Sequence, residues 1–413
     1  MNAPIVQIDP GEAGFDPQRL ERIDRHFEKY VDDGRLPGWQ IVVSRGGEVV
    51  HSSTYGNRDI ESGAPWEHDT VARMYSMTKP VTSVAAMMLY EEGAFQLKDP
   101  VADYIPAFAD TEVFRGGSIL KPVTEPQIEP MRVWHLLTHT SGLTYGFHNS
   151  HAVDAIYRGS GLDEFDYPPG LDLEQICDRW AALPLVFQPG TSWNYSVATD
   201  VVGRLVEVVS GMPLDEFVRT RITEPLKMSE TEFWVQPDQV DRLASLYVPS
   251  PKTGQAAVPP AAMGAVPTNR PDMISGGGGL YGTAADYLRF AHMLLNRGEL
   301  DGTRLLSPRT VDFMTENHLP GNVDLEAFGQ STFAETSFDG VGFGLGFSVM
   351  MDPIANGVLS SPGEFAWGGA ASTAFWVDPL EEIVAVFLTQ LLPSSTHPIR
   401  PQLKQLVYQS LVD

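Results

Sequence analysis

The strand-forming segments of this chain lie near its two ends, and this distribution constrains the fold more than any other feature. Near the N-terminus, a helical apolar pattern at residues 15–33 precedes a hairpin pattern at 39–53. Near the C-terminus, a predicted helix at 399–411 follows three strand-like segments, at residues 344–351, 371–377 and 383–391. The two ends are therefore expected to build one antiparallel sheet flanked by helices, which is an α+β fold of the α/β-sandwich type.

The middle of the chain has a different pattern. Residues 75–340 contain mostly helical patterns separated by long loops rich in proline and glycine, such as 115–130 and 248–271. We predict an α/β domain formed by residues 1–74 and 341–413, and a helical domain formed by residues 75–340. The cleft between two such domains is the expected place for an active site.

Charge and hydropathy narrow the range of partners. The 28 lysines and arginines against 53 aspartates and glutamates give a net charge of -25, which repels nucleic acid and anionic membranes. The most apolar helical segment, residues 81–90, has about half of the ~20 residues that cross a bilayer, and the N-terminus lacks the pattern of a secretory signal. The single cysteine, Cys177, excludes an intrachain disulfide. We expect a cytoplasmic protein that acts on a small molecule.

The pattern Ser-x-x-Lys, which places an amine near a serine hydroxyl, occurs twice, at Ser76 to Lys79 and at Ser118 to Lys121. Pro80 and the apolar residues after it predict that Ser76 lies in the first turn of a buried helix, where residues i and i+3 share a face. Ser118 follows two glycines in a predicted loop, which does not fix that spacing. Ser76 is therefore the candidate nucleophile, with a helix N-cap as its alternative role. The Gly-x-Ser-x-Gly elbow of α/β-hydrolases does not occur in the sequence.

Two further segments carry candidate groups for this chemistry. Tyr195 precedes a predicted helix and is either a base or a core aromatic residue; as a base, its pKa of ~10 would have to fall beside a cation such as Lys79. The two groups would titrate as a pair, so the proton is assigned to neither. Gly368 and Gly369 adjoin a predicted strand, where a peptide N–H could join that of Ser76 in binding an oxyanion, or where the chain forms a bulge.

Three motifs follow one another along the chain: Ser76-x-x-Lys79, Tyr195-Ser196-Val197 and Trp367-Gly368-Gly369. In this order, and with residues 134–143 between the first two, they resemble the serine β-lactamase and penicillin-binding-protein superfamily. They resemble most closely the family VIII carboxylesterases, which are related to class C β-lactamases. The resemblance implies a β-lactamase-like fold, with Ser76 as nucleophile and Lys79 and Tyr195 as the proton-transfer pair. It also implies an oxyanion hole made by the amides of Ser76 and Ala370, and structural roles for His135 and His139.

Two positions depart from the β-lactamase pattern, in which Tyr-x-Asn and Lys-Thr-Gly contact the substrate. Here Val197 replaces the asparagine and Trp367 replaces the lysine, so with Gly368 and Gly369 they are expected to line a more apolar substrate pocket. We therefore predict a serine carboxylesterase that hydrolyses small, short-chain esters through an acyl-enzyme on Ser76. The alternatives are a β-lactamase or D-amino-acid peptidase, an acyltransferase, and a non-catalytic scaffold.

Neither a cofactor nor a metal is expected. The histidines lack metal-ligand spacing such as His-Glu-x-x-His. The four glycines at 276–279 lack the strand-to-helix spacing of a phosphate-binding loop, and they predict a flexible or tightly turned loop instead.

Overall fold

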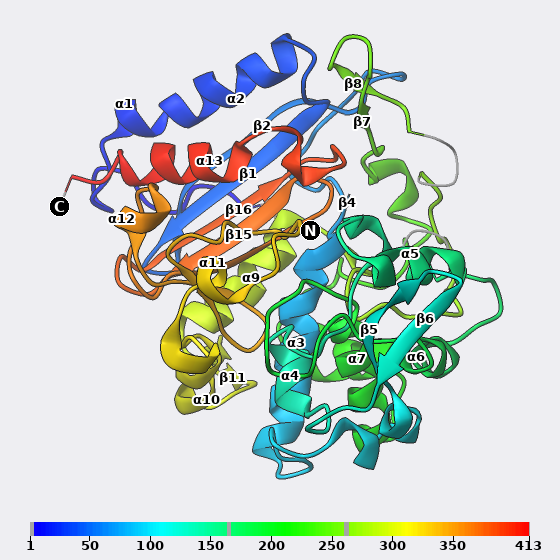
Figure 1. Cartoon of the computed structure of the whole chain (residues 1–413). Helices are drawn as coiled ribbons and strands as arrows, with labels where there is room; N and C mark the ends of the chain where they lie inside the picture. Colours follow the sequence, from blue (N-terminus) through cyan, green and yellow to red (C-terminus); the bar gives the residue numbers. More distant parts are fainter. Residues whose placement is uncertain (1–3, 163–166, 260–263, 413) are drawn as a thin grey trace.

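An eight-stranded antiparallel sheet forms the centre of the computed structural model, which describes residues 4–162, 167–259 and 264–412 (Figure 1). In spatial order its strands are β12 (Val341–Phe343), β13 (Ser348–Met350), β14 (Phe365–Gly369), β15 (Thr373–Asp378), β16 (Ile383–Leu388), β1 (Gly38–Arg45), β2 (Glu48–Asp59) and β3 (Ala64–Pro65). Strand β1 pairs with β16, so segments from the two ends of the chain meet inside the sheet. The predicted antiparallel sheet built from both ends is confirmed.

Each central strand contributes to two cores, because successive side chains of a strand point to opposite faces of the sheet. Ile41 packs on the face that is covered by α2 (Arg22–Asp32) and α13 (Ile399–Tyr408). Its neighbour Val42 packs on the other face, which is covered by α9 (Ala284–Leu295). The predicted α+β class, with helices flanking the sheet, is therefore confirmed.

The rest of the chain is largely helical and lies beside the sheet (Figure 1). Helix α3 (Thr78–Glu91) is buried on every side from Thr78 to Leu89 and packs against α7 (Ala198–Ser210). A helix that is apolar all round belongs in a core, and this one supports the site described below. The remaining helices are α1 (Pro17–Leu20), α4 (Val133–Leu137), α5 (Ala152–Gly159), α6 (Leu173–Ala181), α8 (Leu214–Val218), α10 (Pro308–Met314), α11 (Leu325–Phe328) and α12 (Pro353–Asn356).

Short strand pairs replace parts of the two predicted loops at 115–130 and 248–271. In these loops lie the pair β5 (Val113–Ser118) with β6 (Lys121–Glu125) and the pair β7 (Val248–Pro249) with β8 (Ala256–Ala257). Two further short pairs lie outside them: β4 (Ala72–Arg73) with β9 (Tyr281–Gly282), and β10 (Glu299–Leu300) with β11 (Thr303–Arg304). Glycine weakens a strand pattern, but the β5–β6 hairpin requires one at Gly117, whose φ of 91° lies in the region that other residues rarely adopt. A Cβ atom there would lie 2.4 Å from the Lys121 carbonyl oxygen.

The division into two domains at residues 74 and 341 stays a prediction. Helix α9 lies within the predicted helical domain, yet it packs on β15 and β16. Its Tyr287 ring lies 4.9 Å from the Phe375 ring of the sheet, between centroids. Judged by its packing, α9 therefore belongs with the sheet, although its residues fall within the predicted helical domain.

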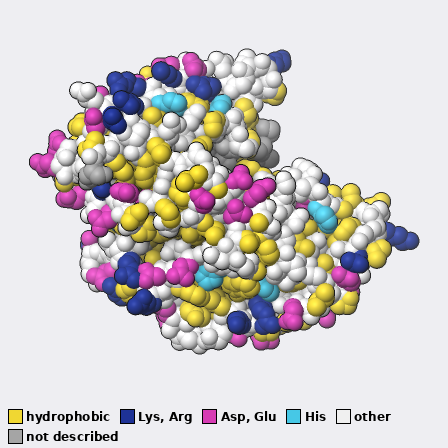
Figure 2. Space-filling model, turned by 60° about the vertical axis from the view of Figure 1, so that its left-hand side comes forward, with side chains coloured by type: hydrophobic (Ala, Val, Ile, Leu, Met, Phe, Trp, Pro, Cys, Tyr) yellow, Lys and Arg dark blue, Asp and Glu magenta, His cyan; other side chains and the backbone are white. Residues whose placement is uncertain are grey.

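Charged side chains cover much of the surface. On the face shown in Figure 2, acidic side chains gather near the centre, and lysine and arginine side chains lie mostly toward the edges. Within the described parts of the chain, no helix has both the length and the apolar character needed to cross a membrane.

Candidate active site

Ser76 lies in a 3₁₀ turn, Tyr75–Met77, that leads directly into the buried helix α3. Tyr75 has a φ of 46°, in the left-handed region that residues with a Cβ rarely adopt. Such strain persists where the surrounding structure fixes it, and it is frequent at functional sites. The turn places Ser76, which is 9% exposed, on the wall of a large cavity.

The hydroxyl of Ser76 lies in a network of polar groups. The Tyr195 hydroxyl donates a hydrogen bond of 2.5 Å to Ser76 Oγ, and Lys79 Nζ lies 3.3 Å from the same oxygen. Lys79 Nζ also donates to the Gly277 carbonyl oxygen at 2.7 Å and to the Tyr145 hydroxyl at 2.8 Å. The structure therefore brings Ser76, Lys79 and Tyr195 together, although Tyr195 is distant from the other two in sequence.

Tyr145 is the member of this network that the sequence analysis missed. It follows the segment 134–143, and its ring lies 5.2 Å from that of Tyr195, between centroids. Its contact with Lys79 joins residues 66 positions apart in the chain. A spacing pattern has no means of detecting such a contact, because only the tertiary fold creates it.

Tyr195 differs from expectation in its ionisation. Burial raises its pKa well above the usual value of 10, and the nearby carboxylate of Glu335 raises it further, whereas the hydrogen bond with Ser76 acts in the opposite direction. The fall in the pKa that a base role would require is therefore opposed in this resting structure, which favours a neutral phenol. His148 supports the position of Tyr195, since its Nε2 lies 2.6 Å from the Tyr195 carbonyl oxygen.

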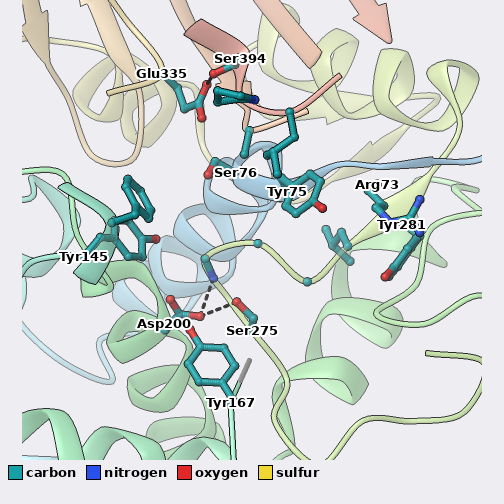
Figure 3. Close-up of a pocket in the computed structure, with 18 of the residues that line it drawn as sticks. Arg73, Tyr75, Ser76, Tyr145, Tyr167, Asp200, Ser275, Tyr281, Glu335 and Ser394 are labelled. Carbon is teal, nitrogen blue, oxygen red and sulfur yellow. Dashed lines mark hydrogen bonds between the residues drawn. The ribbon is translucent and has the colours of Figure 1, made fainter. Parts of the chain in front are cut away.

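A buried carboxylate holds the loop that binds Lys79. Asp200, on α7, accepts hydrogen bonds from the Ser275 hydroxyl at 2.6 Å and from the Gly277 amide at 2.9 Å, as Figure 3 shows. Burial raises the pKa of Asp200, and Lys79 opposes that shift. A Cβ atom on Gly277 would lie 2.4 Å from an oxygen of Asp200. The glycines at 276–279 therefore form a tightly packed loop, as one of the two predicted alternatives stated.

The motif on β14 has a different role from the one predicted. Trp367 and Val197 are 2% and 1% exposed and lie outside the set of residues that line the cavity. The Trp367 ring instead packs 5.4 Å from the Tyr195 ring, between centroids. Trp367 and Val197 are thus corrected from pocket residues to supports behind the site.

Gly368 and Gly369 also lie outside the cavity lining. A Cβ atom on Gly369 would lie 2.3 Å from the Met74 carbonyl oxygen, and one on Gly368 would lie 2.2 Å from Nη2 of Arg400. The predicted close approach to these glycines therefore exists, but the approaching groups belong to the protein and not to a ligand. One of them, the Met74 carbonyl, lies directly before the turn that carries Ser76. This contact brings Ala370 to the cavity wall that Ser76 also lines.

The cavity has a volume of about 750 Å³, which is within the range of small-molecule sites. Its wall is mainly apolar and aromatic, and includes Tyr75, Phe147, Tyr167, Phe233, Tyr281 and Phe333. Arg73, Asp200 and Glu335 are the charged side chains in the described part of the wall. Both terminal nitrogens of Arg73 donate to backbone carbonyl oxygens, of Ala244 at 2.9 Å and of Gly264 at 3.2 Å.

His135 and His139 are buried side chains, and the His139 ring lies 5.2 Å from the Tyr195 ring, between centroids. Nδ1 of His135 accepts from the Arg132 amide at 3.1 Å, and Nδ1 of His139 lies 3.1 Å from Ser196 Oγ. Burial lowers the pKa of His135 to about 4 and that of His139 well below 6.5. Among the residues that the structure describes, no group of three or more His, Cys, Asp or Glu side chains is placed to hold a metal ion.

Comparison with known proteins gives concordant matches. The β-lactamase family model matches residues 23–409. The chain is 35% identical to protein Rv1367c of Mycobacterium tuberculosis, over 89% of each chain, and 31% identical to esterase EstB of Burkholderia gladioli, over 98% of this chain and 99% of EstB. The solved structure of EstCE1, a hydrolase with promiscuous acyltransferase activity, superposes with a TM-score of 0.78 at 26% identity, over 95% of this chain and 99% of EstCE1.

Proposed function

The chain belongs to the β-lactamase family and is a serine hydrolase, and from this premise we propose that it hydrolyses neutral carboxylic esters through an acyl-enzyme on Ser76. One observation carries the proposal. Ser76 Oγ, at the wall of an apolar cavity, lies 2.5 Å from the Tyr195 hydroxyl and 3.3 Å from Lys79 Nζ. A serine so placed has both a proton acceptor and a proton donor within reach.

Lys79 is the acceptor in the first step. A neutral amine has two N–H groups, which the Gly277 carbonyl oxygen and the Tyr145 hydroxyl can bind, and its lone pair then faces Ser76 Oγ. As Ser76 attacks the ester carbonyl carbon, its proton passes to Lys79. The pair Lys79 and Tyr195 remains coupled, so a measured pKa belongs to both groups.

Tyr195 is the donor in the second step. Burial favours its phenol form, which gives its proton to the alkoxide as the ester bond breaks and then regains a proton from Lys79. Water reverses the sequence: it loses a proton to the same pair, attacks the acyl carbon and releases the acid and Ser76.

The amides of Ser76 and Ala370 form the oxyanion hole in this proposal. The support lies in the peptide between Gly369 and Ala370, whose carbonyl oxygen accepts a hydrogen bond of 3.3 Å from Arg400 Nη2. A hydrogen bond to a peptide oxygen strengthens donation by the amide of the same peptide. Donors fixed before the reaction stabilise the developing oxyanion without reorganisation.

The cavity supports neutral esters as the substrate class. A wall of aromatic and apolar side chains favours uncharged ligands, and a volume of about 750 Å³ accommodates more than a short acyl chain. We therefore extend the predicted short-chain preference to esters with a larger apolar part on either side of the ester bond.

Mass spectrometry of the intact protein tests the proposal. After brief exposure to p-nitrophenyl esters of increasing chain length, the mass is expected to rise by that of the acyl group, and Ser76→Ala is expected to show no increase. Nitrocefin in a parallel sample tests the β-lactamase alternative. Unchanged ester turnover in Ser76→Ala would contradict the proposal and favour a site elsewhere, and absence of all turnover would favour the scaffold alternative.

Acyl transfer is a second candidate function. It is favoured by the likeness to EstCE1, a hydrolase with promiscuous acyltransferase activity, and by the apolar cavity, which would concentrate an organic alcohol beside the acyl-enzyme. Adding 1-butanol to a reaction with p-nitrophenyl butyrate distinguishes the two. Butyl butyrate as the main product would favour transfer, and butyrate as the main product would favour hydrolysis.

A further inference from the structure

Glu335 is a buried carboxylate on the wall of the catalytic cavity. It is 2% exposed and precedes β12, in a segment that no predicted motif includes. Its Oε2 accepts a hydrogen bond of 2.8 Å from the Ser394 hydroxyl and an ion-pair hydrogen bond from Arg400 Nη2. Figure 3 shows Glu335 and Ser394 on the side of the cavity where Ser76 lies, away from Asp200 and Ser275.

Arg400, the second residue of α13, lies behind this carboxylate when viewed from the cavity. Its guanidinium donates to backbone carbonyl oxygens of Glu335 at 2.8 Å and of Thr373 at 3.1 Å. Glu335 lines the catalytic cavity, whereas Arg400 lines a neighbouring one of about 370 Å³. The negative member of the pair thus faces the substrate side, and the positive member is held on the other side.

The rest of the wall, as far as the structure describes it, adds no cation that is directed at a substrate. Arg73 is engaged by two backbone carbonyl oxygens, and Asp200 is a second carboxylate. An anionic group on a substrate would therefore meet Glu335 beside the nucleophile, in surroundings where little water screens the repulsion.

We propose that Glu335 determines specificity by excluding substrates that carry a carboxylate near the reacting carbonyl, and that it masks Arg400, which would otherwise attract them. This inference rests on the proposed ester hydrolysis at Ser76. Glu335 also raises the pKa of Tyr195, so its field extends to the reacting groups.

The test uses Glu335→Gln, which keeps the shape and an acceptor for Ser394 but removes the charge and unmasks Arg400. We compare kcat/KM for p-nitrophenyl valerate with that for mono-p-nitrophenyl glutarate, whose acyl chain has the same length and ends in a carboxylate. The wild-type protein is expected to prefer the valerate. The variant is expected to shift this preference about tenfold or more toward the glutarate, mainly through KM, since juxtaposed like charges oppose binding.

Glu364→Gln is the matched control. Glu364 is 1% exposed and paired with Lys404, but it lies outside the described cavity lining, so both substrates are expected to change equally. Glu335→Asp keeps the charge and is expected to keep the wild-type preference. If Glu335→Gln does not fold, Arg400→Gln decides the matter, because leaving Glu335 unmasked should strengthen the discrimination against glutarate.

The outcomes separate this inference from the proposed function. A wild-type protein that hydrolyses neither substrate would overturn the proposed function. An active wild-type protein that prefers glutarate, or a preference that Glu335→Gln leaves within twofold of the wild-type value, would overturn only the role of Glu335. An unchanged preference in Arg400→Gln would do the same where Glu335→Gln is not folded.

Discussion

Ser76 and Lys79 lie at the start of a buried helix, whereas Ser118 and Lys121 face each other across the turn of an exposed hairpin. Both pairs satisfy the same Ser-x-x-Lys pattern. In the first, burial and contacts from distant segments bring Tyr195 to the serine hydroxyl, and Tyr145 and the Gly277 loop to the amine. The Ser-x-x-Lys spacing is therefore only a precondition for this chemistry, and the surrounding fold supplies the groups that bind the hydroxyl and the amine.

Removing the amine from each segment tests most directly whether only the buried pair takes part in the reaction. Lys79→Ala is expected to lower kcat/KM for p-nitrophenyl butyrate by about 10³-fold or more, because proton transfer from Ser76 is lost. Lys121→Ala, on the exposed hairpin, is expected to leave it unchanged. Steady-state rates of both variants decide the matter, and an equal loss in the two would contradict the assignment.

Substitution of the two tyrosines compares how much each partner of the buried pair contributes to kcat. Tyr195→Phe removes the hydrogen bond to Ser76 Oγ and the proposed donor to the leaving alcohol, so kcat is expected to fall about 10²-fold to 10³-fold. Tyr145→Phe removes only an acceptor for Lys79, and about tenfold is expected. Tyr55→Phe, at a half-exposed ring on β2, serves as the control. A larger effect for Tyr145 than for Tyr195 would reverse their roles.

Glycines allow a matched comparison of the two segments. A methyl group on Gly277 would lie 2.4 Å from Asp200, and one on Gly117 would lie 2.4 Å from the Lys121 carbonyl oxygen. Gly277→Ala should displace the loop that binds Lys79 and lower kcat by about tenfold to 10²-fold. Gly117→Ala should cost about 1–2 kcal/mol of stability through its positive φ, with kcat intact. Thermal unfolding and rate measurements on both variants test this contrast.

The free energy of unfolding should depend on pH through the buried segment that contains His135, and not through a histidine of the exposed hairpin. Burial lowers the pKa of His135, on α4, to about 4, whereas the hairpin residues 113–125 contain no histidine. Between pH 6.5 and 4, His135 binds a proton in the unfolded chain but stays neutral in the folded protein. The free energy of unfolding should therefore fall as the pH falls through this range. The slope from this one residue is at most about 1.4 kcal/mol per pH unit. Urea unfolding of the wild-type protein and His135→Gln at pH 7, 6 and 5 should show a shallower decline in the variant.

The fold was largely predictable because alternating and helical patterns are local. One antiparallel sheet from both ends followed from the strand patterns there, and the structure adds that β1 pairs with β16. The family resemblance is confirmed by the β-lactamase match over residues 23–409. The hairpin β5–β6 was missed because its glycines and prolines obscure the alternation on which a strand prediction depends.

The site was predictable only as far as its local motifs extend. Tyr145 contacts Lys79, Asp200 holds the Gly277 loop, and Glu335 lines the same cavity as Ser76. Only the tertiary fold creates these placements. Trp367 and Gly369 were identified, but the sequence does not show what approaches them. The structure places the Tyr195 ring and the Met74 carbonyl oxygen there, where a substrate was expected.

The contact between Gly369 and the turn of Ser76 also bears on how the protein is made. Ser76 and Lys79 precede β14 in the sequence, so they leave the ribosome before it. Until β14 has been synthesised, a growing chain would therefore carry the proposed nucleophile without the strand that contacts its turn. The proposed hydrolysis would begin only once β14 has joined the sheet, so a chain without this strand would expose no working enzyme to the esters around it.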